Sequence, residues 1–186
     1  MQPSPAAAPT AADRGTGPAA RAGADAELAV YLAAHSSPAA CADALIRDAD
    51  GRILLVDPTY KDGWDLPGGM LEDEEPAAGM VREVREELGL DVRPGRLLVM
   101  DTVPARVYGR TILAFVYATE PVRAPGGGFR LQAEEIREAR FCAEPEALAL
   151  VPDELARRLA GALAADRTGT TAVLRHGFPA QRAPRA

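Results

Sequence analysis

The stretch GGMLEDEEPAAGMVREVREELGL, residues 68–90, decides the fold, because it places a glycine-rich turn shortly before an acidic amphipathic helix. Pro76 suits only the first turn of a helix, where its missing N–H is not needed. Gly89 favours the left-handed backbone conformation that ends many helices. We therefore predict a helix from Pro76 to about Leu88.

The two faces of this predicted helix differ in chemistry. Glu83 comes three residues before Glu86 and four before Glu87, so the three carboxylates share one face. Like charges at this spacing destabilise a bare helix by about 0.2–0.5 kcal/mol per pair, and a bound cation reverses that sign. Oxygen ligands at this density favour Mg²⁺ or Mn²⁺ over zinc. The opposite face is apolar and is expected to pack on the core, through Ala77, Met80, Val81, Val84 and Leu88.

Taken alone, the charge pattern is more typical of a solvated helix with ion pairs such as Arg82–Glu86. The whole stretch, however, resembles the Nudix box: glycine, five residues, glutamate, seven residues, then Arg-Glu-aliphatic-x-Glu-Glu-x-Gly-aliphatic. Trp64-Asp65-Leu66-Pro67 also resembles the family's usual lead-in, and the resemblance covers about residues 39–165. Counted from Gly68, every fixed position matches, at Gly68, Glu74, Arg82, Glu83, Val84, Glu86, Glu87, Gly89 and Leu90.

The register of the loop before the helix has two interpretations. In most family members the counted glycine is the second of the pair, which is Gly69 in this chain. That register makes Glu75 the loop glutamate and leaves six residues before Arg82. Glu74 and Glu75 are therefore both candidates for the loop glutamate.

The resemblance implies a role for each residue of the box. Glu83, Glu86 and Glu87 are expected to bind Mg²⁺ or Mn²⁺, with the Gly68 carbonyl as a further ligand. Arg82 is expected to orient the carboxylates by ion pairing. The catalytic candidates within the box are Arg82, Glu83 and Glu86. The loop glutamate is expected to hold the loop against the helix.

Residues outside the box supply the remaining candidates. Many family members carry a further acidic residue in a later loop, which acts as a base or an extra metal ligand. Glu134 and Glu135 follow a Gly-rich segment at a suitable position and are the further catalytic candidates; plain surface charges are the alternative. Loop arginines can clamp phosphates in bidentate fashion, and a tyrosine can stack on a base. The substrate-binding candidates of this kind are Arg106, Arg110, Arg130 and Tyr108.

The rest of the chain predicts strands before, beside and after the central helix. Residues 39–46 and 53–56 are typical of two strands joined as a hairpin by the turn at 48–51. Together with the resemblance, the pattern implies an α/β fold, a Nudix-type α/β/α sandwich with a central mixed β-sheet. The other expected elements are strands at 97–103, 111–118, 136–141 and 171–174, the last at a sheet edge, and helices at 25–34, 144–150 and 153–164.

Length and composition favour one globular domain with flanking segments. The chain has 186 residues, of which 47% are hydrophobic and 26% charged, and this is ordinary for a globular protein. The Ala- and Pro-rich start lacks the composition of a folded core. We predict a disordered tail at 1–24, a helix and linker at 25–38, a Nudix hydrolase domain at 39–167 and a C-terminal extension at 168–186.

Charge and targeting signals restrict partners and location. The net charge of −6 disfavours a stable nucleic-acid partner. No apolar run approaches the roughly 20 residues of a membrane span, so no membrane partner is expected. The start is not typical of a secretion signal, which leaves the cytoplasm as the expected location. A homodimer through the segment before Ala39 stays open.

These observations predict a metal-dependent pyrophosphohydrolase. Its expected substrate is a small-molecule diphosphate, a nucleoside diphosphate linked to another group X. One alternative is a non-catalytic module that senses a nucleotide or sugar nucleotide. Another is a hydrolase of a non-nucleotide diphosphate. The box handles only the diphosphate and the metal, so it does not separate these functions.

Overall fold

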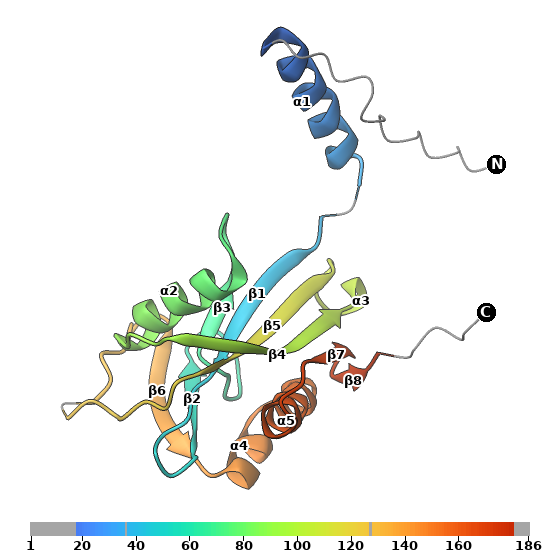
Figure 1. Ribbon diagram of the computed structural model, residues 1–186. Helices are drawn as coiled ribbons and strands as arrows, with labels where there is room; N and C mark the ends of the chain where they lie inside the picture. Colours follow the sequence, from blue (N-terminus) through green and yellow to red (C-terminus); the bar gives the residue numbers. More distant parts are fainter. Residues whose placement is uncertain (1–17, 36, 127, 181–186) are drawn as a thin grey trace. The chain divides into compact units, whose positions relative to one another are not determined.

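A computed structural model describes residues 18–35, 37–126 and 128–180 of the protein (Figure 1). The chain divides into two units between Ser37 and Pro38. Within the described part of the chain, no helix has the length and apolar character required to cross a membrane.

The first unit contains helix α1, Pro18–Ala33. This helix starts earlier than the expected residue 25, so the predicted disordered tail does not extend over residues 18–24. The alanine-rich composition of 18–24 favours helix, and proline is tolerated in a first turn. The prediction of disorder for residues 1–17 lies outside the described residues.

The second unit contains two sheets and four helices among the described residues. The six-stranded sheet has the order β3-β1-β5-β4-β7-β8, and β2 pairs with β6 in a second sheet. The larger sheet is mixed, since β1 runs parallel to β5 whereas β4 runs antiparallel to it. The strands are β1 (Ala39–Leu45), β2 (Ile53–Pro58), β3 (Gly68–Met70), β4 (Pro94–Val103), β5 (Ile112–Thr119), β6 (Ile136–Cys142), β7 (Ala172–Arg175) and β8 (Phe178–Pro179). The helices are α2 (Pro76–Leu88), α3 (Ala105–Tyr108), α4 (Glu144–Leu150) and α5 (Asp153–Thr168).

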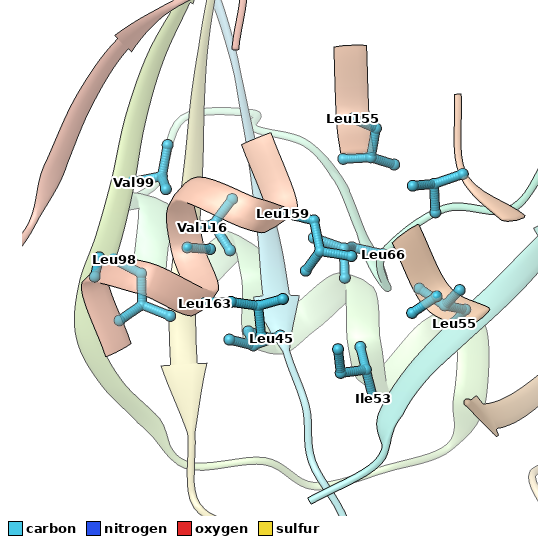
Figure 2. Close-up of a cluster of buried hydrophobic side chains, with 14 of the residues drawn as sticks. Leu45, Ile53, Leu55, Leu66, Leu98, Val99, Val116, Leu155, Leu159 and Leu163 are labelled. Atoms are coloured by element: carbon cyan, nitrogen blue, oxygen red, sulfur yellow. The ribbon is translucent and has the colours of Figure 1, made fainter. Parts of the chain in front are cut away.

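Alternate residues of β1 and β2 bury their side chains in two different cores. Ala44 and Leu54 pack with Met80, Val84 and Leu88 of α2. The neighbouring Leu45 and Leu55 pack on the other side, with α5. Figure 2 shows this second cluster, in which Leu155, Leu159 and Leu163 approach Leu45, Leu66 and Val116. Helices therefore cover both sides of the strands, which confirms the predicted α/β/α sandwich.

The predicted hairpin of residues 39–46 and 53–56 is confirmed only next to its turn. The turn itself forms, because the Asp48 carboxylate accepts hydrogen bonds from the backbone N–H groups of Asp50 and Arg52. Next to the turn, Arg47 and Ile53 form an antiparallel bridge, and the Leu54 N–H donates to the Ile46 carbonyl at 2.9 Å. Beyond this point the two strands separate, since β1 pairs with β3 and β5 while β2 pairs with β6. Both strands thereby gain partners far away in sequence, and a local pattern does not reveal such partners.

Helix α2 forms where the sequence predicts it. It runs from Pro76 to Leu88, and Gly89 caps it with φ of 64° and a backbone hydrogen bond to the Arg85 carbonyl. The strand expected at 171–174 also forms, as β7, but it is not the sheet edge. Strand β8 pairs on its outer side and takes that position.

Replacing Leu163 by alanine tests the packing of α5. Leu163 is fully buried, so its truncation is expected to lower the free energy of unfolding by about 2–5 kcal/mol. The same substitution at Leu32, 56% exposed on α1, is expected to change it by no more than about 0.5 kcal/mol. Urea denaturation of both variants measures the difference, and equal effects would contradict the burial of α5.

Candidate active site

Helix α2 lies close to the backbone of β3 at the Gly68-Gly69 pair. In the β1–β3 ladder, Gly68 faces Asp43 and Gly69 faces Ala42. Gly68 has a φ of 146°, and a Cβ there would overlap the Ala42 carbonyl oxygen. A Cβ on Gly69 would lie 2.6 Å from the Glu83 carboxylate carbon. Both positions therefore require glycine, one for its backbone conformation and both for space.

The Glu87 carboxylate is held against this backbone. Glu87 is only 4% exposed, and its Oε2 accepts a hydrogen bond of 3.0 Å from the Gly68 N–H. Burial raises the pKa of Glu87 to about 8, the Gly68 N–H partly offsets this rise, and the charges of Glu83, Asp65 and Asp43 add to it. A buried carboxylate among other carboxylates lacks a positive partner, which is the environment that a bound cation would stabilise.

Arg82 connects the loop before α2 to the carboxylates on it. Its Nη2 donates to Glu74 Oε1 at 2.6 Å and to the Met70 carbonyl at 3.3 Å. Its Nη1 donates both to Glu83 at 3.0 Å and to Glu86 at 3.1 Å. Because one nitrogen contacts two carboxylates, Glu83 and Glu86 already face a common cationic group.

Of the two candidates for the loop glutamate, Glu74 makes the contact with Arg82. Glu75 is exposed and directly precedes α2, where its carbonyl accepts from the N–H groups of Ala78 and Gly79. A Cβ at Gly79 would overlap Leu71 and approach Glu74, so this glycine lets the loop lie flat on the helix. The geometry therefore matches the register counted from Gly68.

The donor set fits a hard divalent cation in its chemistry, since it offers carboxylate and carbonyl oxygens around a buried acidic centre. Among the described residues, no three Asp, Glu, His or Cys side chains are already arranged around a metal position. The reason lies in Arg82, to which Glu83 and Glu86 are turned. Glu86 is 52% exposed and has room to rotate away from the guanidinium.

A pocket of about 510 Å³ adjoins the two glycines on the side away from α2. Sequence reasoning missed several polar residues that line it, because they come from separate elements with no shared motif. Asp43 belongs to β1, Lys61 and Asp65 to the loop after β2, and Arg158 to α5. Lys61 pairs with Asp65, and the Trp64–Pro67 lead-in was the one signal that pointed to this loop.

The predicted substrate-binding residues are distributed unequally. Tyr108 lines the pocket and donates its hydroxyl hydrogen to Glu154 at 2.7 Å. Arg106 and Arg110 are exposed and are not among the residues that line it. Arg130 packs over Gly89 at the end of α2, where its N–H donates to the Leu88 carbonyl. The structure thus brings Tyr108 to the pocket and leaves the three arginines outside it.

Glu134 and Glu135 lie in an exposed loop that is tied to Thr59. The Thr59 N–H donates to the Glu135 carbonyl at 2.7 Å, and its hydroxyl donates to the Glu134 carbonyl at 2.6 Å. Burial raises the pKa of Glu83, the hydrogen bond and charge of Arg82 oppose this rise, and the charges of Glu86 and Glu135 add smaller contributions to it. The charge of Glu135 thus acts on Glu83 of α2.

Substituting Gly69 by alanine is expected to displace the Glu83 carboxylate, since the new methyl group would lie 2.6 Å from it. We expect weaker binding of Mn²⁺ in titration calorimetry with the fold retained in circular dichroism. A methyl group on Gly126 would meet only open space, so Gly126→Ala serves as the matched control. Unchanged Mn²⁺ binding in Gly69→Ala would contradict the close approach.

The raised pKa of Glu87 predicts a pH-dependent stability in the absence of divalent cations. Between the ordinary value of 4.5 and about 8, the folded chain keeps a proton that the unfolded chain has lost. The free energy of unfolding should therefore fall as the pH rises through this window. Glu87→Gln should make that fall shallower in urea denaturation with a chelator, whereas parallel curves for the two proteins would refute the assignment.

Comparison with known sequences places this geometry in a family. A family model described as NUDIX domain matches residues 37–164. A MutT-like protein of Streptomyces ambofaciens is 34% identical over 112 residues, which are 60% of this chain and 62% of that protein. A putative ADP-ribose pyrophosphatase of Bacillus subtilis is 42% identical over 52 residues, 27% of this chain and 25% of the relative. The chain thus matches less than two thirds of the length of these relatives.

Solved structures agree with the sequence comparison. An ADP-ribose pyrophosphatase from Streptococcus suis has a TM-score of 0.55 at 27% identity, covering 75% of this chain and 99% of that one. A MutT protein from Methanosarcina mazei has a TM-score of 0.60 at 24% identity, covering 73% and 97%, and shows likeness of fold. The family model spans most of the chain and contains the whole Gly68–Leu90 stretch, so the chain belongs to the Nudix family.

Proposed function

We propose that the protein is a metal-dependent pyrophosphohydrolase acting on a nucleoside diphosphate linked to a further group X. The observation that carries the proposal is the contact between buried Glu87 and the Gly68 N–H, next to the cluster of Arg82, Glu83 and Glu86. This arrangement lines up acidic groups beside a pocket of about 510 Å³, a size suited to a small molecule.

The names of similar proteins support the same class of reaction. Relatives in sequence and structure are described as an ADP-ribose pyrophosphatase or a putative one. A structure of the same fold, at 18% identity, is described as a UDP-X diphosphatase. These descriptions all refer to cleavage of a diphosphate and differ in the group attached to it. They therefore support the proposal that this protein cleaves a diphosphate bond more strongly than they support any particular substrate.

Glu83, Glu86, Glu87 and the Gly68 carbonyl would hold Mg²⁺ or Mn²⁺. A divalent cation at such a site lowers the pKa of water and neutralises charge on phosphate oxygens. The protein itself positions the groups that would hold the cation. Burial keeps Glu87 in place against β3, and Glu74 holds the Arg82 guanidinium at the start of the carboxylate row.

Arg82 has a positioning role in this proposal. Its contacts are all with protein groups, namely Glu74, Glu83, Glu86 and the Met70 carbonyl. It orients the Glu83 and Glu86 carboxylates that would hold the cation, and positioning is a main source of rate in phosphate chemistry. Glu135, whose charge reaches Glu83, is the proposed proton acceptor for the attacking water.

Location and assembly stay predictions. A cytoplasmic enzyme without a membrane or nucleic-acid partner is what the sequence indicates, and a homodimer through the segment before Ala39 is untested. The two alternative functions, a nucleotide sensor and a hydrolase of a non-nucleotide diphosphate, differ from the proposal in turnover and in substrate, respectively.

Glu87→Gln tests the proposed chemistry. The variant keeps the shape of the side chain but loses the charge, so hydrolysis should fall by at least about 100-fold, beyond the usual effect of a group that only supports a metal ligand. The measurement is phosphate or nucleotide release from nucleoside diphosphate sugars, ADP-ribose, dinucleoside polyphosphates and an isoprenyl diphosphate, with Mg²⁺ or Mn²⁺. Glu120→Gln, at a side chain 68% exposed, is the matched control and should keep full activity.

The same panel separates the alternatives. Release from the isoprenyl diphosphate alone would favour the non-nucleotide hydrolase. Thermal stabilisation by nucleotides without turnover by the wild-type protein would favour the sensor. Full activity of Glu87→Gln on any substrate would show that the α2 carboxylates do not carry the reaction.

A further inference from the structure

The pocket beside Gly68 and Gly69 has an inner end, lined by the buried residues Leu155 and Arg158 of α5, that the diphosphate chemistry does not use. One wall is formed by β3 and the loop with Lys61 and Asp65, next to the proposed metal ligands. From there the pocket extends over Cys41 and Ala114 to α5. A substrate whose diphosphate lies at the glycines would place its remaining part toward α5.

Arg158 of α5 lines this inner end and is held from behind. Only 9% of its side chain is exposed, and its Nε donates to Asp101 Oδ2 at 3.0 Å. Asp101 is fully buried, and the same oxygen accepts the Gly177 N–H at 3.0 Å. The Gly177 N–H therefore holds Asp101, and Asp101 in turn holds the Arg158 guanidinium.

The terminal nitrogens of Arg158 have no protein acceptor within hydrogen-bond distance in the described part of the chain. These terminal nitrogens are not sealed in the protein interior, since Arg158 lines the pocket, so their donors are available to an acceptor that enters it. The acceptor that completes the hydrogen bonding of Arg158 has to enter the pocket.

The charges around the pocket favour a neutral acceptor over an anion. Its lining carries four carboxylates, those of Asp43, Asp62, Asp65 and Glu154, against the cations Lys61 and Arg158. Lys61 is paired with Asp65, and Arg158 is paired with Asp101 behind it. The inner end therefore has no excess positive charge to attract a further phosphate.

The pocket also has aromatic walls suited to a planar group. Tyr60 and Tyr108 both line it and are 68% and 57% exposed. Large exposed aromatic side chains beside a pocket offer flat surfaces on which a nucleobase can stack. A base also brings the neutral ring carbonyl that a guanidinium binds well.

We propose that Arg158 is a specificity-determining residue that donates to the C4 carbonyl of a pyrimidine or the C6 carbonyl of a purine, and so selects bases with an oxo group at that position over bases with an amino group there. The inference rests on the proposed nucleotide hydrolysis. The arginine side chain only donates hydrogen bonds. An amino group in place of the carbonyl is also a donor, so it would not accept from Arg158 and would leave Arg158 unpaired. Asp101 acts as the positioning residue for the guanidinium.

Matched substrate pairs test the proposal, since uracil and cytosine, or hypoxanthine and adenine, differ at this group. We compare kcat/KM for UDP-glucose with CDP-glucose, and for ITP with ATP. The wild-type protein is expected to prefer the oxo member of each pair by about 10-fold to 100-fold, the discrimination of a good arginine–base contact. Arg158→Met should bring the ratio close to one by lowering only the rate on the oxo member.

Arg157→Met is the matched control on the same helix. The Arg157 guanidinium lies 4.6 Å from the Phe178 ring centroid, and the residue does not line the pocket. This variant should keep the wild-type ratio. If Arg158→Met unfolds because Asp101 is left buried and unpaired, the double variant Arg158→Met/Asp101→Asn removes that charge and should show the same loss of preference.

Thermal shifts with UDP and CDP in a chelator give a readout independent of turnover. UDP should stabilise the wild-type protein more than CDP, and Arg158→Met should abolish the difference. Equal ratios in wild type and Arg158→Met would overturn the inference while leaving hydrolysis intact. An equal loss on both members of each pair would assign Arg158 to the phosphates and overturn it as well. Absence of any hydrolysis, with the UDP preference kept, would refute the proposed function alone.

Discussion

Helix α2 and the β3 backbone lie so close together that a single added carbon atom on Gly69 would collide with the Glu83 carboxylate. The rest of the site depends on this contact. It lets the Gly68 N–H reach Glu87, and it brings the loop carrying Glu74 over the first turns of the helix. The apolar face of α2, packed on β1 and β2, keeps the helix in position while its opposite face carries the acidic groups.

The contact concentrates negative charge where the fold provides little to neutralise it. Arg82 compensates part of this charge by forming ion pairs with Glu74, Glu83 and Glu86 at the same time. Glu87 has no such partner among the residues that the structure describes, and burial raises its pKa to about 8. A site of this kind is stable when a cation enters it and strained when its carboxylates ionise alone, which links metal binding, pH and stability in one interaction.

Residues from distant parts of the chain together hold one residue of the pocket, Arg158, in place. Asp101 lies in the middle of the sheet on β4, Arg158 on α5, and Gly177 in the turn between β7 and β8. His176, with a φ of 55°, and Gly177, with a φ of 78°, form a tight turn that directs the Gly177 N–H at Asp101. The segment after residue 168, expected as an extension, thus takes part in holding a pocket residue in place.

The sequence by itself determined the central helix, its glycine cap and the family, because these depend on spacing within one short stretch. Glu83 shares a helix face with Glu86 and Glu87, and Arg82 with Glu86, whatever surrounds them. The tertiary structure decided which residues from different elements meet, and the spacing of residues in the sequence does not determine this. It brought Glu74 rather than Glu75 to Arg82, and it left Arg106, Arg110 and Arg130 outside the pocket. It also kept the expected hairpin paired only next to its turn and sent the rest of its two strands into different sheets. It also assembled Asp43, Lys61 and Arg158 around that pocket, since pairing between strands and packing of a late helix join residues that no local pattern connects.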